Sequence, residues 1–335
     1  MKKSILIIQT AFIGDTILAS AFARQVSVNY PDHEIHFLLR KGNESVIDGL
    51  PFIKKVWIWD KKQNKLRALY RLIKELGYYN FQIVFNIHRY FNSGLITFFT
   101  RAKFKVGFIQ NPLSLFYTHK VHHQIPYTED GRVLHEVERN FKLLKKLKPE
   151  ATLPMPNKPE LPITEADFEK VKNLKTTSYV VVAPASVWAT KQWPWESYRD
   201  LVGRLALSYQ VYLIGAPDDK ELCEKVRAES NAVNLAGKLS LKQSAALMKD
   251  AKRVFVNDSA PVHLASAVNA PTTAFFCATI KEFGYGPLAD DSIILESPEQ
   301  LSCRPCGLHG GNHCPKLHFK CALNISILAA EKTIS

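Results

Sequence analysis

The chain has 335 residues, of which 46% are hydrophobic and 22% are charged. This is the composition of a soluble globular protein and excludes a disordered chain, and the length is sufficient for two domains. No stretch approaches the roughly 20 consecutive apolar residues that a membrane-spanning helix needs.

The positive charge is concentrated in the first half of the chain. Residues 1–150 contain 24 Lys and Arg against 12 Asp and Glu, whereas residues 151–335 contain 20 against 19. This asymmetry favours an anionic partner for the first half, such as a phosphorylated substrate, an anionic membrane face or nucleic acid. A basic surface that only increases solubility is the alternative that charge alone leaves open.

The segment IIQTAFIGDTILASAFA (7–23) allows two interpretations. With Lys2 and Lys3 before it and Ala-Phe-Ala at its end, it has the outline of a secretory signal. The apolar positions from Ile17 to Val26, however, recur at helical spacing, and polar residues interrupt the apolar run. We therefore interpret the segment as a first strand, a tight turn and the start of a helix.

Strand and helix patterns alternate through the rest of the first half. Strands are predicted at 34–39, 54–59 and 81–87, and helices at 62–76 and 92–101. A proline-rich segment at 149–162 is typical of a linker between domains.

The alternation restarts beyond this linker. Strands are predicted at 179–184, 210–215, 253–258 and 272–277, and helices at 195–207 and 218–229. Such alternation predicts parallel sheets covered by helices, so the expected fold class is α/β. Two successive Rossmann-like domains with a substrate cleft between them are the natural arrangement.

Gly14 and Asp15 follow the first predicted strand, where open parallel sheets bind their ligands. Glycine permits a close backbone approach, and Asp15 would point into the cleft at the start of a helix. An aspartate that only caps this helix is the structural alternative, and position alone does not separate the two.

The loop after strand 179–184 is a candidate phosphate cradle. It contains Ser186, Thr190 and Lys191 shortly before a helix start, where backbone amides and a cation favour an anion. A surface loop with a solvated lysine is the alternative.

The segment VNDSAPVHLASAV (256–268) has the same organisation. Asp258 ends a strand, and Ser259, Ala260 and Val262 can offer backbone N–H groups at a helix N-terminus. His263 could face a ligand there, although an ordinary buried histidine is the alternative. No GxGxxG or GxxxxGK[ST] motif opens a helix in either half, which argues against a dinucleotide oxidoreductase or a P-loop NTPase.

Seven segments are informative in combination: TAFIGDTILAS (10–20), NIHRYFNSG (86–94), HEVERNFKLL (135–144), KQWP (191–194), NLAGKLSL (234–241), VNDSAPVHLASAV (256–268) and CRPCG (303–307). In their order and spacing they resemble the ADP-heptose:lipopolysaccharide heptosyltransferases of glycosyltransferase family 9, over nearly the whole chain. The resemblance implies a GT-B fold, with an acceptor-binding domain at 1–155 and a nucleotide-sugar-binding domain at 156–335, whose last helix could pack back on the first domain.

The resemblance also implies the function: an inverting, metal-independent transfer of heptose from ADP-heptose to the inner core of lipopolysaccharide. By match, Asp15 is the general base, and the acceptor side includes Gly14, His88 and Arg89. The donor side comprises Ser186, Thr190, Lys191, Asp218, Lys238, Asp258, Ser259, Ala260 and His263. Either Asp218 or Asp219 would hold the ribose, and the acceptor hydroxyl could belong to Kdo or to a first heptose.

Expectations on cofactors, partners and location follow from the same resemblance. We expect no cofactor and no metal, because the chain contains no Asp-x-Asp triplet and Lys191 with a helix N-terminus can supply positive potential instead. Six cysteines, four of them near the end, favour a reducing compartment. We expect a cytoplasmic enzyme in peripheral contact with the inner membrane, and no nucleic-acid partner.

Three alternatives remain from the sequence. A family relative could use another nucleotide sugar, and a basic nucleic-acid-binding protein is the competing class, although no recognised binding module occurs. A structural metal is conceivable at Cys303, Cys306, Cys314 and Cys321, with a reduced cysteine-rich loop as the alternative.

Overall fold

The computed structural model describes residues 3–62, 64–127 and 131–334, and the chain divides into two compact units, Met1–Pro162 and Ile163–Ser335. The boundary lies seven residues beyond the expected one at 155, because the proline-rich segment is held on the first unit. The Gln25 side chain donates to Asn157 at 2.7 Å, and the Glu160 amide donates to the Ser20 hydroxyl at 2.8 Å.

The first unit contains a six-stranded parallel sheet in the order β3-β2-β1-β4-β5-β6. Its strands are β1 (Lys3–Ile8), β2 (His33–Arg40), β3 (Ile53–Trp59), β4 (Phe81–Asn86), β5 (Phe104–Phe108) and β6 (His119–Val121). Its helices are α1 (Ile13–Asn29), α2 (Glu44–Ile47), α3 (Lys65–Gly77), α4 (Phe91–Phe99) and α5 (Glu136–Leu147), with the short 3-10 helix η1 (Ser114–Phe116).

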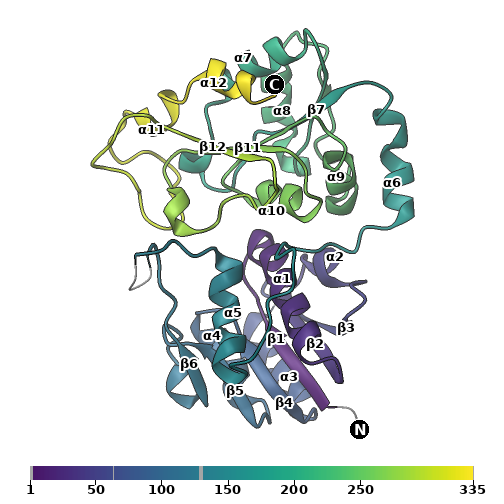
Figure 1. The fold of residues 1–335 in the computed structure, drawn as a ribbon, viewed down its shortest axis with the longest axis vertical. Coiled ribbons are helices and arrows are strands. Elements are labelled where there is room, and N and C mark those ends of the chain that lie inside the picture. The colour runs from purple at the N-terminus through teal and green to yellow at the C-terminus, as the bar shows by residue number, and fades with distance from the viewer. Residues whose placement is uncertain (1–2, 63, 128–130, 335) are drawn as a thin grey trace. The chain divides into compact units, whose positions relative to one another are not determined.

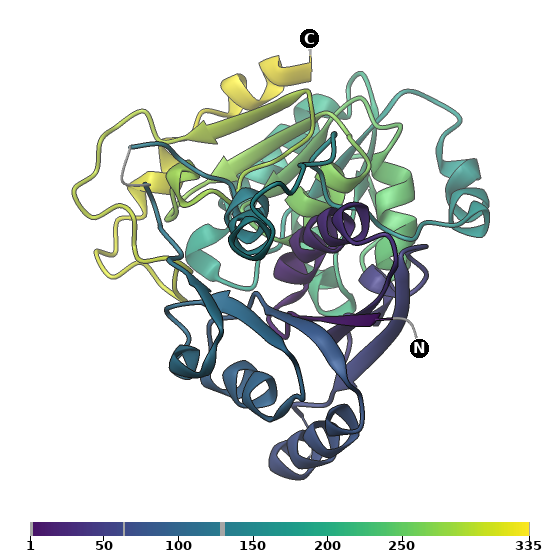
Figure 2. The ribbon, with the colours of Figure 1, turned by 60° about the horizontal axis from the view of Figure 1, so that its bottom comes forward.

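The helices of the first unit cover both faces of its sheet. Helices α1 and α5 lie side by side on one face, and α3 and α4 lie on the other (Figure 2). Strand β1 pairs with β2 on one side and β4 on the other, and its residues from Ile5 to Ile8 are fully buried. The opening segment is therefore the central strand and first helix of this unit, as predicted.

The second unit repeats the same plan around a sheet in the order β12-β11-β10-β7-β8-β9 (Figure 1). Its strands are β7 (Tyr179–Ala183), β8 (Gln210–Leu213), β9 (Val233–Asn234), β10 (Val254–Asn257), β11 (Thr272–Phe276) and β12 (Ser292–Glu296). Its helices are α6 (Glu165–Val171), α7 (Trp195–Leu205), α8 (Lys220–Arg227), α9 (Leu241–Met248), α10 (Ala260–Ala267), α11 (Lys320–Leu323) and α12 (Ile327–Glu331). The last of these, α12, packs against α7 of its own unit.

In each sheet, successive strands are added first on one side of the first strand and then on its other side. In the first unit the chain moves outward from β1 through β2 to β3 and then returns to β4, and in the second it moves from β7 to β9 and returns to β10. Ligands of open parallel sheets bind outside the carboxyl ends of the strands at such switch points. Each of the two Rossmann-like units predicted from the sequence therefore has a candidate ligand site at its switch point. In the first unit it lies at the carboxyl ends of β1 and β4, and in the second at those of β7 and β10.

Aromatic packing holds the loop before α7 against the sheet of the second unit. Trp193, from the KQWP segment, is fully buried and stacks on Phe275 of β11 with 4.2 Å between ring centroids. Tyr198 of α7 meets both rings edge-on. Burial of three aromatic rings anchors the loop before α7 onto the sheet, since each contributes a large apolar area.

In the described part of the chain, no helix is both long enough and apolar enough to cross a membrane.

Candidate functional site

The switch point of the first unit brings Thr10 and His88 together. The Thr10 hydroxyl, after β1, lies 3.0 Å from Nδ1 of His88, after β4. Burial, followed by the charges of Lys61 and Arg89, lowers the pKa of His88 to about 3. The imidazole is therefore neutral near pH 7, so it can exchange a hydrogen bond with a ligand but cannot supply a positive charge.

Asp15 lies in the first turn of α1 but does not cap it. The N-cap position is Phe12, and Ile13, Gly14 and Asp15 are the first three helical residues. The interpretation of Asp15 as an N-cap is therefore wrong, and its half-buried carboxylate stands at the positive end of a 17-residue helix. A negative charge in this position interacts favourably with the helix dipole.

Lys61 joins this edge, although the sequence analysis did not single it out. Its ammonium group donates to the Thr10 carbonyl at 2.5 Å and lies 4.5 Å from the Trp59 ring centroid. Burial, followed by the charges of Arg40 and Lys65, lowers its pKa to about 8. The sequence contains a signal for this position, because Lys61 lies just after the predicted strand 54–59.

Two further cations lie at the carboxyl ends of neighbouring strands. Arg40 is the last residue of β2 and stacks over the Phe12 ring at 5.3 Å, and Arg89 follows β4. Lys103, by contrast, precedes β5 and thus lies at the amino edge of the same sheet. Arg40, Lys61 and Arg89 therefore lie at the carboxyl edge of the sheet, with the candidate site, and Lys103 lies at the opposite edge.

In the second unit the switch point holds an ion pair. The Lys191 ammonium lies 2.6 Å from Oδ2 of Asp258, and the same oxygen accepts a hydrogen bond from the Thr279 hydroxyl at 2.7 Å. Lys191 follows β7 and Asp258 follows β10, so the structure brings together two residues predicted separately. The side chains are 15% and 6% exposed, which leaves the lysine accessible at one side of the pair.

Asn257 positions the loop that carries Lys191. Its side-chain oxygen accepts hydrogen bonds from the Trp193 amide at 2.9 Å and the Tyr198 hydroxyl at 3.0 Å, and its nitrogen donates to the Pro184 carbonyl at 2.8 Å. Asn257 is fully buried, and every hydrogen bond connects the end of β10 to the segment after β7. Only the tertiary contacts reveal this role, because an asparagine at a strand end has no distinctive spacing.

Thr190 also has a positioning role, which differs from the expected donor contact. Its side chain is 2% exposed, and its hydroxyl accepts a hydrogen bond from the Gly311 amide at 2.8 Å. The Thr190 amide in turn donates to the Gly311 carbonyl at 3.0 Å. Gly310 has φ of +73°, and a Cβ there would lie 2.9 Å from the Thr190 hydroxyl, so glycine permits this close approach.

Arg304, within the CRPCG segment, holds the segment after β12 against the sheet. Its guanidinium donates to the carbonyls of Cys277 at 2.7 Å and Thr279 at 2.6 Å, and forms an ion pair with Glu296 at 2.6 Å. The segment after β12 is thereby held against the ends of β11 and of the Lys191 loop.

The cysteines of this segment do not assemble a metal site in the described residues. The Cys303 sulfur lies 3.7 Å from Nε2 of His318, and the Cys306 sulfur contacts the Cys303 carbonyl. Burial, followed by the nearby Cys303 and Cys314, raises the pKa of the Cys306 thiol, so it stays protonated near pH 7. Within the ranges that the structure covers, no group of three or more His, Cys, Asp and Glu side chains is arranged to hold a metal ion.

The N-terminus of α10 offers fewer amides than predicted. Ser259 is the N-cap, but its amide donates to the Asn257 carbonyl at 2.7 Å, and the Val262 amide donates to the Ser259 carbonyl at 3.0 Å. Pro261 has no N–H, so Ala260 is the remaining amide of this turn. His263 is buried within the helix at 5% exposure.

The two aspartates after β8 have different surroundings. Asp219 accepts a hydrogen bond from the Ala216 amide at 2.8 Å and thereby caps the short helix η4 (Pro217–Asp219). Asp218 is exposed beside it, which favours Asp218 as the ligand contact. Lys238 follows β9 at the same edge of the sheet and donates to the Asn234 carbonyl at 2.8 Å.

The HEVERNFKLL segment has a structural role. His135 caps α5, and Glu136 lies between His123 and Arg139, with a contact of 2.9 Å to each. Burial would raise the pKa of Glu136, but the two partners outweigh it and lower that pKa to about 2. Burial lowers the pKa of His123, so its imidazole is neutral near pH 7 and Arg139 is the cation that pairs with buried Glu136. The hydrogen bond between His123 and Glu136 ties α5 to the segment after β6.

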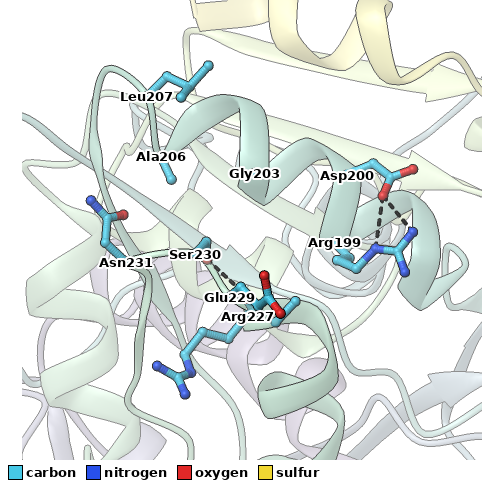
Figure 3. Close-up of a pocket in the computed structure, with 10 residues that line it drawn as sticks. Arg199, Asp200, Gly203, Ala206, Leu207, Arg227, Glu229, Ser230 and Asn231 are labelled. Atoms are coloured by element: carbon cyan, nitrogen blue, oxygen red, sulfur yellow. Dashed lines mark hydrogen bonds and ion pairs between the residues drawn. The ribbon is translucent and has the colours of Figure 1, made fainter.

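An open pocket of about 540 Å³ lies elsewhere on the second unit (Figure 3). It is lined by α7 and by the residues after α8, from Arg199 to Asn231. Most of its lining belongs to the C-terminal ends of these helices, which lie toward the amino edge of a parallel sheet. The pocket is therefore separate from the switch point that carries Lys191.

Comparison with known proteins places this geometry in a family. The family model for glycosyltransferase family 9 (heptosyltransferase) matches residues 69–310. A lipopolysaccharide core heptosyltransferase, OpsX, of Haemophilus influenzae is 25% identical over 287 residues, covering 82% of this chain and 79% of the relative. The lipopolysaccharide heptosyltransferase 3 of Escherichia coli is 26% identical over 285 residues, covering 80% and 82%.

Solved structures agree on the fold. The E. coli ADP-heptose heptosyltransferase II superposes with a TM-score of 0.79 at 20% identity, covering all of this chain and 97% of that one. The E. coli heptosyltransferase WaaC with ADP gives 0.75 at 19% identity, covering 99% and 98%. The GT-B type of two Rossmann-like units expected from the sequence is thus confirmed.

Proposed function

Because the chain belongs to glycosyltransferase family 9, we propose that it transfers heptose from ADP-heptose to the inner core of lipopolysaccharide, with inversion at the anomeric carbon and without a metal ion. The Lys191–Asp258 pair at the switch point of the second sheet carries this proposal, because it puts one accessible cation where a diphosphate would bind. The relatives are lipopolysaccharide heptosyltransferases, which supports heptose as the sugar and lipopolysaccharide as the acceptor.

The proposed reaction is a single displacement. The carboxylate of Asp15 takes the proton of the acceptor hydroxyl, whose oxygen forms a bond to the anomeric carbon of heptose. The bond from that carbon to the phosphate oxygen breaks at the same time, and ADP leaves with the electron pair. Lys191 and the Ala260 amide stabilise the negative charge that develops on the leaving phosphate. Attack opposite the leaving group inverts the configuration.

The remaining donor contacts follow from position at the same edge. Ser186 follows β7 with Lys191, and Lys238 follows β9. Exposed Asp218, after β8, holds the ribose hydroxyls in this proposal. Asp258 orients Lys191 and adjoins the sugar. Asn257 and Thr190 act through the loop that they hold, so we regard them as positioning residues.

The acceptor side uses the other unit. Lys61, Arg40 and Arg89 supply the charge for the phosphate and carboxylate groups of the inner core, while His88 contributes a neutral hydrogen bond. Gly14 leaves room beside Asp15 for the attacking hydroxyl. A lipid acceptor also requires contact with a membrane, so we place the enzyme in the cytoplasm, peripheral to the inner face of the inner membrane.

The decisive experiment is turnover with a matched panel of donors and acceptors. We expect release of ADP with ADP-heptose and not with UDP-glucose or GDP-mannose, and only with a Kdo-lipid A or a heptosylated acceptor. Activity should persist in excess EDTA. Loss of activity on chelation would exclude the metal-free reaction, and faster turnover with another nucleotide sugar would make the enzyme a relative with a different donor.

A further inference from the structure

Helix α4 buries Ser93 and Thr97 on one side but leaves part of its phenylalanine-rich side uncovered. Its sequence is FNSGLITFF, and a helix of this kind is ordinarily buried on all faces. Phe98 and Phe99 at its end are 38% and 50% exposed, and on the neighbouring turn Leu115 and Phe116 are 68% and 44% exposed. We refer to these four residues as the α4 patch.

The α4 patch is a continuous cluster of side chains. The Phe98 ring contacts Phe99 with 5.0 Å between centroids and Phe116 with 4.6 Å, both edge-on. Gly94 makes this possible, because a Cβ at its position would collide with the Asn111 side chain and push the turn away from the helix. Apolar residues that are exposed singly need no explanation, but a contiguous exposed cluster marks an interaction surface.

The stretch of sequence that contains the α4 patch is basic. Residues 76–127 contain no Asp or Glu, and Arg101, Lys103 and Lys105 follow α4 directly. The Lys105 ammonium donates to the Phe98 carbonyl at 2.6 Å and lies 5.8 Å from the centre of its ring. Lys103 lies over the Phe104 ring at 5.2 Å. The cations therefore border the apolar surface itself.

This combination identifies one class of partner. Aromatic side chains enter the boundary between headgroups and acyl chains, while lysine and arginine bordering them attract anionic lipids. A protein partner would require a complementary acidic surface, and residues 76–127 offer none for a second copy of the same face.

We propose that the α4 patch and its three cations dock the enzyme on an anionic lipid bilayer. The inference extends the proposed function, because a lipid-linked acceptor gives membrane docking its purpose, but the physical contact does not depend on which sugar is transferred. Helix α4 starts just after Arg89 and has nine residues, so its length of about 13 Å separates the α4 patch from the acceptor residues. That spacing fits a saccharide core projecting from the bilayer.

Binding to vesicles of defined composition tests the proposal. Purified enzyme is sedimented with vesicles of phosphatidylcholine alone or with 30% phosphatidylglycerol. We expect binding to the anionic vesicles at low salt and much weaker binding to the neutral ones. The double variant Phe98→Ser/Phe116→Ser should lose about tenfold or more of the partition coefficient, since two aromatic anchors are removed. Arg101→Glu/Lys103→Glu should lose at least about fivefold per cation.

Matched controls lie on the second unit. Leu207 is 86% exposed and Lys225 is also exposed, so Leu207→Ser and Lys225→Glu repeat the chemical changes outside the α4 patch. Phe98→Ser/Phe116→Ser should lower the melting temperature, because the ring contacts of Phe98 are lost. Transfer to a lipid-free core oligosaccharide, measured at a temperature at which every variant is folded, should be unchanged in all variants, which separates docking from catalysis. Absence of heptose transfer with intact vesicle binding would overturn the proposed function and leave the docking surface.

Two results would overturn the docking surface. One is equal binding of wild type and patch variants to anionic vesicles, or equal losses in the control variants. The other is a wild-type dimer in sedimentation velocity that Phe98→Ser/Phe116→Ser dissociates, without vesicle binding by either protein. In that case the α4 patch is an interface between two copies of the chain.

Discussion

The two units have the same strand order, but their switch points carry different charge. Between β1 and β4, burial lowers the pKa of Lys61 to about 8 and that of His88 to about 3, and nearby cations add to both shifts: Arg40 acts on Lys61, and Lys61 and Arg89 act on His88. Between β7 and β10, Lys191 faces Asp258 at 2.6 Å and Thr279 completes the contact. The switch point of the first unit therefore has several cations close together (the crowded edge), and that of the second has a lysine paired with an aspartate (the paired edge).

This difference shows that one topology can carry two electrostatic environments. Crowded cations repel each other, so an anion that binds between them relieves repulsion and is attracted over a long range. A lysine already paired with a carboxylate has a fixed position but less attraction for a distant anion. The first edge is thus suited to capture a large anionic acceptor, and the second to orient one diphosphate.

The largest expected effect concerns Asp15. Asp15→Asn keeps the shape of the side chain but removes the proton acceptor, so kcat should fall by about 10²–10⁴. Donor affinity should hardly change. The melting temperature should fall by at most the small contribution of one carboxylate at a helix N-terminus. The measurement is steady-state transfer at saturating substrates; near-normal kcat in this variant would exclude Asp15 as the base.

The second effect concerns the paired edge. Lys191→Ala removes a charge-assisted contact with phosphate of about 1.5–3 kcal/mol, so ADP affinity measured by calorimetry should fall about tenfold or more. Because Asp258 would be left buried without its cation, the variant Lys191→Ala/Asp258→Asn should regain stability but not affinity. Lys249→Ala, in the same unit, is the control. Unchanged ADP affinity would remove Lys191 from the donor site.

The third prediction uses the pH dependence of acceptor KM to test the role of Lys61 at the crowded edge. Lys61 is charged below its pKa of about 8 and neutral above it, so acceptor KM should rise above pH 8, by up to about tenfold per unit. Donor KM should not follow the same curve. Lys61→Arg, which stays charged, should keep acceptor KM flat to pH 9. A pH profile identical in this variant and the wild type would show that Lys61 does not contact the acceptor.

The smallest effect is a response to salt. Acceptor KM should rise several-fold between about 20 and 150 mM salt, because the exposed cations of the first unit are screened, whereas donor KM should respond less. Transfer to a lipid-free acceptor keeps membrane docking out of this measurement. Equal salt responses of both constants would mean that the two edges do not differ as their charges indicate.

Much of the architecture was predictable from local patterns. The strands 34–39, 54–59, 81–87, 179–184 and 253–258 are apolar and bounded by turn residues, and each matches a strand of the structure within a few residues. The edge strands β6, β9 and β12 were not predicted, because they have two to five residues and few buried positions. Their pairing with neighbours, rather than their own periodicity, makes them strands.

In the candidate site, too, some residues could be identified from the sequence, whereas their contacts required the structure. Asp15, Lys191 and Asp258 could be named from the sequence because each follows a recognisable strand in a motif of the family. That Lys191 pairs with Asp258, that Asn257 and Gly311 hold the loop between them, and that Thr190 is buried required the fold. These partners are 64 to 121 residues apart in the chain, and side-chain type gives no measure of such distances.

The sequence by itself determined the α/β class, the two Rossmann-like halves and the excess of positive charge in the first, because periodicity and composition are local properties. The tertiary structure alone decided which cations gather around Thr10 and which border the uncovered rings of α4. The reason is that parallel strands bring residues from distant turns to one edge, where burial and mutual repulsion set their pKa values. Lys61 and Lys103 have the same side chain, and the fold places them at opposite ends of the first sheet.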